Sequence, residues 1–96
     1  MIVVEKTEEF QKWHLGLKDK TSKTRITARL DRVEQGNLGD FKNLKDGLYE
    51  LRFTFGGGIR VYYTWRGDEI VLLLAGGNKS DQEADIARAK EMISEL

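Results

Sequence analysis

Alternation of apolar and polar residues in the second half of the chain predicts three strands, at residues 48–55, 59–66 and 69–75. The turns between them contain glycine and are too short for a crossover, so the strands should form antiparallel hairpins. Successive side chains point to opposite faces of a strand, so one face should be apolar and pack on helices. That face carries Leu51, Phe53, Phe55, Ile59, Val61, Tyr63, Trp65, Ile70, Leu72 and Leu74. The other face is polar and cationic, with Glu50, Arg52, Thr54, Arg60, Tyr62, Thr64 and Arg66.

The first third of the chain predicts a short strand and two helices. Residues 2–4 are rich in β-branched side chains, which favours a strand. Thr7 can then cap a helix, whose apolar stripe is Phe10, Trp13 and Leu17. A second apolar stripe is formed by Ile26, Leu30 and Val33. This second helix should end at the sequence Gln-Gly-Asn of residues 35–37, where glycine can adopt the left-handed cap conformation.

The end of the chain completes the predicted fold. Residues 38–47 have the pattern of a connector, and a final helix should begin at Ser80, with Ser80 and Glu83 forming a capping box. The sequence therefore predicts one small α+β domain over residues 1–96, in the order β-α-α-β-β-β-α. Its sheet is expected to be antiparallel, with the helices packed on one face.

Hairpin geometry should gather basic residues at one end of the sheet. If the three glycines at 56–58 close the first hairpin, Arg52 and Arg60 become diagonal neighbours within reach of one phosphate. A two-residue turn in the second hairpin would set Arg60 opposite the small side chain of Ala75. Lys79 follows the last strand and can approach the same end. The sequence thus predicts a cationic, partly aromatic hollow.

Composition limits the chemistry that this hollow can perform. The chain has no cysteine and one histidine, which argues against disulfides, a metal centre and any metal cofactor. No apolar run approaches the roughly 20 residues of a membrane span, so we expect a cytoplasmic protein without membrane contact. The net charge is zero, yet residues 18–66 hold 11 basic and 6 acidic side chains, and residues 67–96 hold 3 basic and 7 acidic. This asymmetry is compatible with a localised anion-binding surface.

Several motifs occur in a characteristic order along the chain. They are Tyr-Glu-Leu-Arg at 49–52, Gly-Ile-Arg-Val-Tyr-Tyr at 58–63, Leu-Leu-Ala-Gly-Gly-Asn-Lys at 73–79 and Ile-Ala-Arg-Ala at 86–89. This order resembles the C-terminal half of RelE/ParE toxins. Together with Ala-Arg-Leu-Asp-Arg-Val at 28–33 and residues 36–40, it resembles the HigB-like branch, the addiction module killer proteins. The similarity covers nearly the whole chain.

The resemblance implies the toxin of a type II toxin–antitoxin system. Such a toxin is a ribosome-dependent endoribonuclease that cleaves mRNA without a metal or other cofactor, and a cognate antitoxin keeps it silent. Basic residues on its central strands hold the scissile phosphate, which implies Arg52, Arg60 and Lys79 as catalytic residues. Arginine suits this role because its guanidinium stays charged and can bind phosphate through two hydrogen bonds.

The other candidate site residues are expected to bind substrate. They are Tyr62, which could stack on a base, and Thr54, Asn78 and Arg66. Tyr62 or Lys79 could also transfer a proton, provided that its pKa is lowered. Many relatives carry a tyrosine or histidine near the start of the last helix or within it. The nearby residues here are Asp81, Asp85 and Ile86, which leaves the general base open.

Three other interpretations remain open. The basic strand residues could form an ordinary solvated sheet face, and a ParE-like protein would inhibit DNA gyrase without catalysis. A degenerate toxin could act only as a co-repressor that binds operator DNA with its antitoxin. Val71 and Leu73 are expected on the polar side of the sheet, either as an antitoxin docking surface or beneath the last helix.

Overall fold

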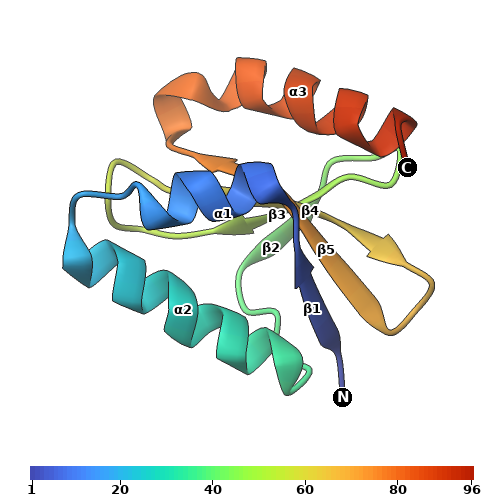
Figure 1. The fold of residues 1–96 in the computed structure, drawn as a ribbon, viewed down its shortest axis with the longest axis horizontal. Helices are drawn as coiled ribbons and strands as arrows, with labels where there is room; N and C mark the ends of the chain where they lie inside the picture. The colour runs from blue at the N-terminus through green and yellow to red at the C-terminus, as the bar shows by residue number, and fades with distance from the viewer.

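Five strands form one mixed sheet at the centre of the molecule (Figure 1). The computed structural model describes all residues from 1 to 96. The strands are β1 (Val3–Lys6), β2 (Phe41–Asn43), β3 (Tyr49–Arg52), β4 (Arg60–Arg66) and β5 (Ile70–Gly77). They lie in the order β1-β5-β4-β3-β2, in which only β1 and β5 are parallel neighbours.

Three helices pack against this sheet. They are α1 (Glu8–Leu15), α2 (Lys20–Glu34) and α3 (Gln82–Ser94), and a short 3₁₀ turn, η1 (Lys79–Asp81), precedes α3. The hydroxyl oxygen of Thr7 accepts a hydrogen bond from the backbone N–H of Phe10 at 3.0 Å, which confirms the predicted cap of α1. None of the helices has the length and apolar composition needed to span a membrane.

The predicted α+β class and the order of the predicted elements are confirmed, but the sheet differs in two details. It is mixed because β1 runs parallel to β5, and it gains a fifth strand because β2 pairs with β3. The sequence pattern missed β2 because all three of its side chains are exposed, so it shows no alternation of burial. The predicted capping box at Ser80 is also wrong. The Asn78 side chain instead accepts from the backbone N–H of Ser80 at 3.0 Å.

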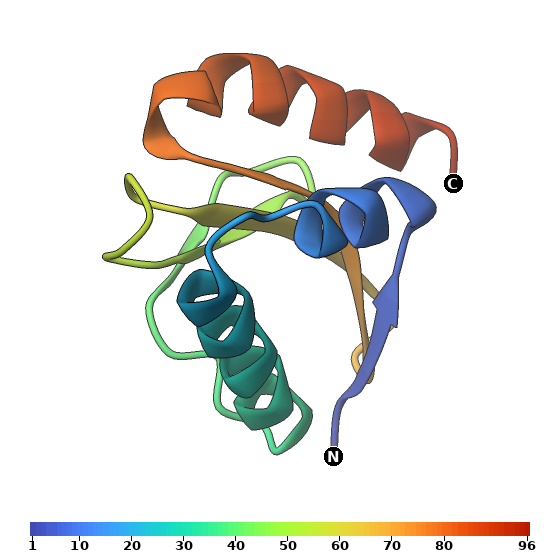
Figure 2. The ribbon, with the colours of Figure 1, turned by 60° about the vertical axis from the view of Figure 1, so that its left-hand side comes forward.

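The helices cover both faces of the sheet, not one as predicted. Helices α1 and α2 lie on one side and α3 lies on the other (Figure 2). The main core beneath α1 and α2 comprises Phe10, Ile26, Leu30, Val33, Leu51, Phe53, Ile59, Val61, Tyr63, Val71 and Leu73. A smaller core beneath α3 comprises Leu48, Tyr62, Leu72, Leu74 and Ala89.

The pairing of β4 with β5 explains why α3 has a face to cover. Arg66 pairs with Ile70 and not with Glu69, and an irregularity between Tyr62 and Tyr63 shifts the pairing further. A one-residue slip exchanges the two faces of a strand. Val71 and Leu73 are therefore fully buried in the main core, so the prediction that they form a docking surface or lie under the last helix is wrong.

Candidate functional site

The candidate site lies where β3 ends, β4 begins and β5 passes into η1. Arg52 pairs directly with Arg60, which replaces the predicted diagonal arrangement because the loop between β3 and β4 is longer than its three glycines. Arg60 also pairs with Gly77, not with Ala75 as predicted. These pairings place the end of β5, and hence Asn78 and Lys79, beside Arg60, with Arg52 on the opposite side of Arg60.

The β3–β4 loop closes the site against η1. The backbone N–H of Lys79 donates to the carbonyl of Gly57 at 3.3 Å. A Cβ atom placed on Gly58 would lie 3.2 Å from the Cβ of Lys79 and 3.6 Å from a guanidinium nitrogen of Arg60. Gly58 also has a φ of +79°, so both its conformation and its crowding favour glycine. Arg60 is therefore next to Arg52 on one side and near Lys79 on the other, at the end of the sheet where the sequence predicts a cationic hollow.

Arg60 is buried and already bound by the protein. The residue is only 8% exposed. Its Nη1 donates to the carbonyls of Phe53, Gly58 and Ile59 at 3.4, 3.1 and 3.2 Å. Its Nε is buried without a partner. The guanidinium thus holds the two ends of the β3–β4 loop together. Its positive charge is buried next to Arg52.

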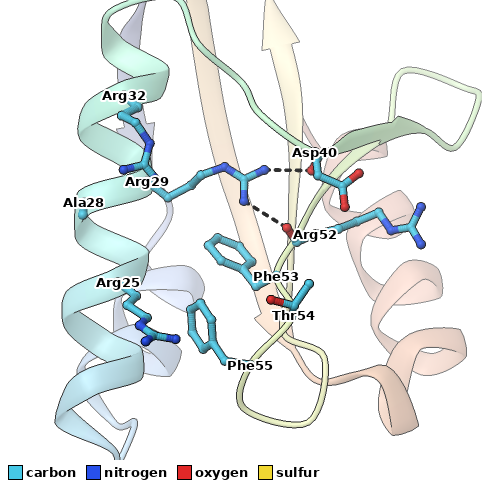
Figure 3. A pocket seen from close by; sticks show the side chains of 9 residues that line it. All are labelled: Arg25, Ala28, Arg29, Arg32, Asp40, Arg52, Phe53, Thr54 and Phe55. Atoms are coloured by element: carbon cyan, nitrogen blue, oxygen red, sulfur yellow. Dashed lines mark hydrogen bonds between the residues drawn. The ribbon is translucent and has the colours of Figure 1, made fainter.

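Arg52 presents a more accessible guanidinium. Its side chain is 42% exposed, and its Nε lies 4.0 Å from a carboxylate oxygen of Glu50, at the limit of an ion pair. Figure 3 shows the Arg52 side chain pointing away from α2, while its backbone carbonyl faces Arg29. Lys79 is exposed and takes part in no ion pair within the protein. Arg52 and Lys79 are therefore the two cations best placed to meet an anion from solution.

Tyr62 does not have the exposure predicted for a stacking residue. It is fully buried beneath α3, and its hydroxyl has no hydrogen-bond partner. Burial raises the pKa of the phenol well above its usual value, nearby Glu50 and Asp85 raise it further, and Arg60 lowers it. In this conformation Tyr62 can neither stack on a base nor lose a proton readily, because α3 covers it.

The remaining predicted contacts are divided between the site and the rest of the sheet. Thr54 is exposed in the β3–β4 loop, and the Asn78 side chain caps η1. Arg66 is not part of the site, because six residues of β4 place it roughly 20 Å from Arg60. It lies 3.4 Å from Glu5 in an exposed ion pair at the opposite end of the sheet. Arg66 therefore lies outside the candidate site, apart from the other predicted substrate contacts.

Comparisons with known proteins agree with this architecture. A family model described as "Phage derived protein Gp49-like (DUF891)" matches residues 12–94. The chain belongs to the Gp49-like family. An uncharacterised protein of Haemophilus influenzae is 42% identical to this Gp49-like chain over 95 residues, covering 99% of the chain and 96% of the relative.

A solved structure shares the fold of the Gp49-like chain. The free state of a double arginine mutant of the Escherichia coli toxin RelE superposes with a TM-score of 0.75, covering 96% of this chain and 97% of that one. The two sequences are 15% identical, so this likeness establishes the fold alone.

Two acidic residues adjoin the site of this Gp49-like protein, and no pattern in the sequence predicts a role for either. Glu50 is 2% exposed, and the Gln82 side chain donates to it at 3.2 Å. Asp85 of α3 lies against Gly77, where any Cβ would collide with its Oδ2, and that oxygen is buried without a partner. Burial, then Asp81 and Glu9, raise the pKa of Asp85. No group of three or more metal-ligating His, Cys, Asp or Glu side chains is present.

Proposed function

We propose that this Gp49-like protein is the toxin of a type II toxin–antitoxin system, in the HigB-like branch, and cleaves mRNA on the ribosome without a metal. One observation carries the proposal. Buried Arg60 lies between accessible Arg52 of β3 and the end of β5, which leads to Lys79, so three cationic side chains share one end of the sheet. Family membership and the RelE-like fold support it.

The chemistry suited to such a site is internal transesterification of RNA. The 2′-oxygen forms a bond to the adjacent phosphorus while the bond from phosphorus to the 5′-oxygen breaks. One proton leaves the 2′-hydroxyl, and another is delivered to the departing 5′-oxygen. Negative charge accumulates on the phosphate as the transition state forms, and preorganised cations stabilise it.

The residues divide this work according to their exposure. Arg52 and Lys79 contact the phosphate, because both are accessible. Arg60 is a positioning residue, since its Nη1 is committed to the loop carbonyls, and it adds positive charge from below. Thr54 and Asn78 border the phosphate position. Tyr62 is buried, so we assign it no proton transfer. Lys79 is exposed and remains the candidate for that role.

The decisive test is cleavage of mRNA by purified protein on translating ribosomes, mapped by primer extension. Arg52→Ala should reduce the cleavage rate by roughly 10²-fold or more, the scale for losing one charge-stabilising group. Its thermal melt should match that of the wild type. Arg66→Ala is the matched control, because it removes an exposed arginine at the far end of the sheet, and it should cleave normally. Full cleavage by folded Arg52→Ala would contradict the mechanism.

The cellular experiment separates this function from gyrase inhibition. Expression of the chain alone should stop growth, with translation failing before DNA synthesis. If supercoiling fails first while mRNA remains intact, the protein is a ParE-like gyrase inhibitor instead.

The proposed partner is a cognate antitoxin that presents acidic side chains to Arg52 and Lys79. The complex of the two proteins would also bind operator DNA. Hydrogen exchange should show protection of the β3–β4 loop and η1 in the complex. Protection confined to α1 would argue against this docking position.

A further inference from the structure

A second cationic feature lies on the other side of β3. A groove of about 430 Å³ separates α2 from residues 52–55 at the end of β3 (Figure 3). Four arginines and one aspartate line it, together with the aromatic rings of Phe53 and Phe55. The groove is lined by residues of α2, which take no part in the candidate site. The groove and the site share Arg52 and Thr54.

One stripe of α2 builds the helical wall of the groove. Arg25, Ala28, Arg29 and Arg32 follow the spacing i, i+3, i+4 and i+7, which places them on one face of a helix. The small Ala28 leaves space between the long arginine side chains. Because the apolar stripe of the same helix faces the core, the arginine stripe is directed to the edge of the sheet.

Arg29 makes the groove a fixed feature of the fold. It is only 9% exposed, and it donates to the carbonyls of Leu38, Asp40 and Arg52 at distances between 2.8 and 3.1 Å. Its guanidinium carbon also lies 4.7 Å from the centre of the Phe53 ring. These bonds tie α2 to the connector before β2 and to the end of β3, so they set the width of the groove.

The other two arginines of the stripe have no polar partner within the protein. Arg25 and Arg32 are exposed and form no ion pair or hydrogen bond through their side chains. The guanidinium of Arg25 lies 5.1 Å from the centre of the half-buried Phe55 ring. Seven residues of helix separate Arg25 from Arg32, about 10 Å along the axis. A ligand that meets both must therefore run along α2.

We propose that this groove binds a single-stranded RNA segment next to the phosphate held by Arg52. Phosphates of the segment contact Arg25 and Arg32, and one base takes the place of the Arg25 guanidinium over the Phe55 ring. The inference rests on the proposed function and extends it by naming the path of the substrate. Cations interleaved with an aromatic ring are the usual means of gripping single-stranded nucleic acid, whereas an acidic peptide needs no stacking surface.

The test uses the full chain and a fluorescein-labelled, fully 2′-O-methylated RNA dodecamer, which lacks the attacking hydroxyl and so is not cleaved. Anisotropy titrations at several salt concentrations report affinity without ribosomes. The Arg25→Ala/Arg32→Ala double variant should bind at least tenfold more weakly. The slope of log affinity against log salt concentration should be shallower for this variant by about 1.4. This is the value for two lost phosphate contacts on a single strand. Phe55→Leu should weaken binding several-fold with an unchanged slope.

A double variant of equal charge loss supplies the control. Arg66→Ala/Arg88→Ala removes two exposed arginines outside the groove, and it should retain the wild-type affinity. Equal weakening by this control would mean bulk attraction only and would overturn the proposal. So would unchanged RNA binding by the groove variant together with loss of binding to an oligoglutamate peptide, or no RNA binding by the wild type. Thermal melts verify that every variant folds.

The two proposals can fail separately. Loss of dodecamer binding by the groove variant, in a wild-type protein that never cuts ribosomal mRNA, would retain the groove and reject the nuclease. Cleavage that depends on Arg52, with dodecamer binding unaffected by the groove substitutions, would retain the nuclease and reject the groove.

Discussion

The two faces of the sheet are built from the same strands but differ in how many polar groups they bury without hydrogen-bond partners. Beneath α1 and α2, eleven buried apolar or aromatic residues form a continuous core. Beneath α3, only five such residues are buried, and they share the space with Glu50, Arg60 and Asp85. Of the four buried side-chain atoms without a partner, three lie on the α3 side: Arg60 Nε, Tyr62 OH and Asp85 Oδ2.

This difference indicates which face maintains the fold and which is specialised. Unpaired buried polar atoms cost free energy, so a surface selected only for stability would not collect them. On the α2 side, buried Arg29 has three carbonyl partners, and its cationic neighbours lie at the rim. The α3 side has the less complete packing, and it also adjoins the proposed catalytic cations. One measurement compares the two faces directly, and two more test the polar groups on the α3 side.

The largest effects should come from two adjacent leucines of β5. Leu73 and Leu74 are both fully buried, but Leu73 belongs to the main core and Leu74 to the smaller core beneath α3. Leu73→Ala should lower the free energy of unfolding by about 4 kcal/mol, and Leu74→Ala by about 2.5 kcal/mol, within the range for buried leucines. Urea denaturation measures both. Equal losses would mean that the two faces are equally well packed.

A smaller effect is expected from the two paired arginines. Arg60→Ala removes the donor that serves three loop carbonyls, so the free energy of unfolding should fall by about 2 kcal/mol. Arg52→Ala should change it by less than about 0.5 kcal/mol, because its side chain makes only a long ion pair. Denaturation of the two variants side by side gives the comparison. If Arg60→Ala leaves the free energy of unfolding unchanged, the buried guanidinium does not stabilise the fold.

The smallest effect concerns Asp85 and depends on pH. The pKa of Asp85 is raised in the folded state. The stability that its neutral form provides is therefore fully present below pH 3.8, the ordinary pKa of an aspartate side chain. That stability is lost as pH rises through the folded-state pKa. Asp85→Asn should therefore stabilise the protein at pH 7, by less than about 1 kcal/mol because solvent screens this partly exposed carboxyl. The gain is limited because a carboxylate in the first turn of α3 also interacts favourably with the helix dipole.

The gain from Asp85→Asn should disappear as pH falls below about 4, where the wild-type carboxyl is neutral as well. Glu83→Gln is the matched control, since Glu83 is an exposed carboxylate in the same helical turn, and it should give no gain at any pH. Thermal melts across this pH range make the measurement. A gain that persists at pH 3 would show that the effect is not electrostatic.

Local interactions made much of the fold predictable. Thr7 caps α1 because a hydroxyl at that position reaches an N–H three residues ahead, and Gly36 follows α2 with a φ of +93°. The convergence of Arg52, Arg60 and Lys79 was predictable because a hairpin brings adjacent strands together. The exact pairing was not, since neither the loop of β3–β4 nor the irregularity in β4–β5 has a clear sequence signal.

The sequence by itself determined the three helices, four of the five strands, their order and the clustering of cationic residues at one end of the sheet, because these depend on periodicity and short turns. Only the tertiary structure decided which arginines are available to a ligand. Arg29 and Arg60 are buried by long-range packing and bind backbone carbonyls, whereas Arg25, Arg32 and Arg52 reach solvent. No local pattern distinguishes these arginines, since burial depends on which distant segment covers each one. The same holds for Tyr62, which α3 removes from the surface.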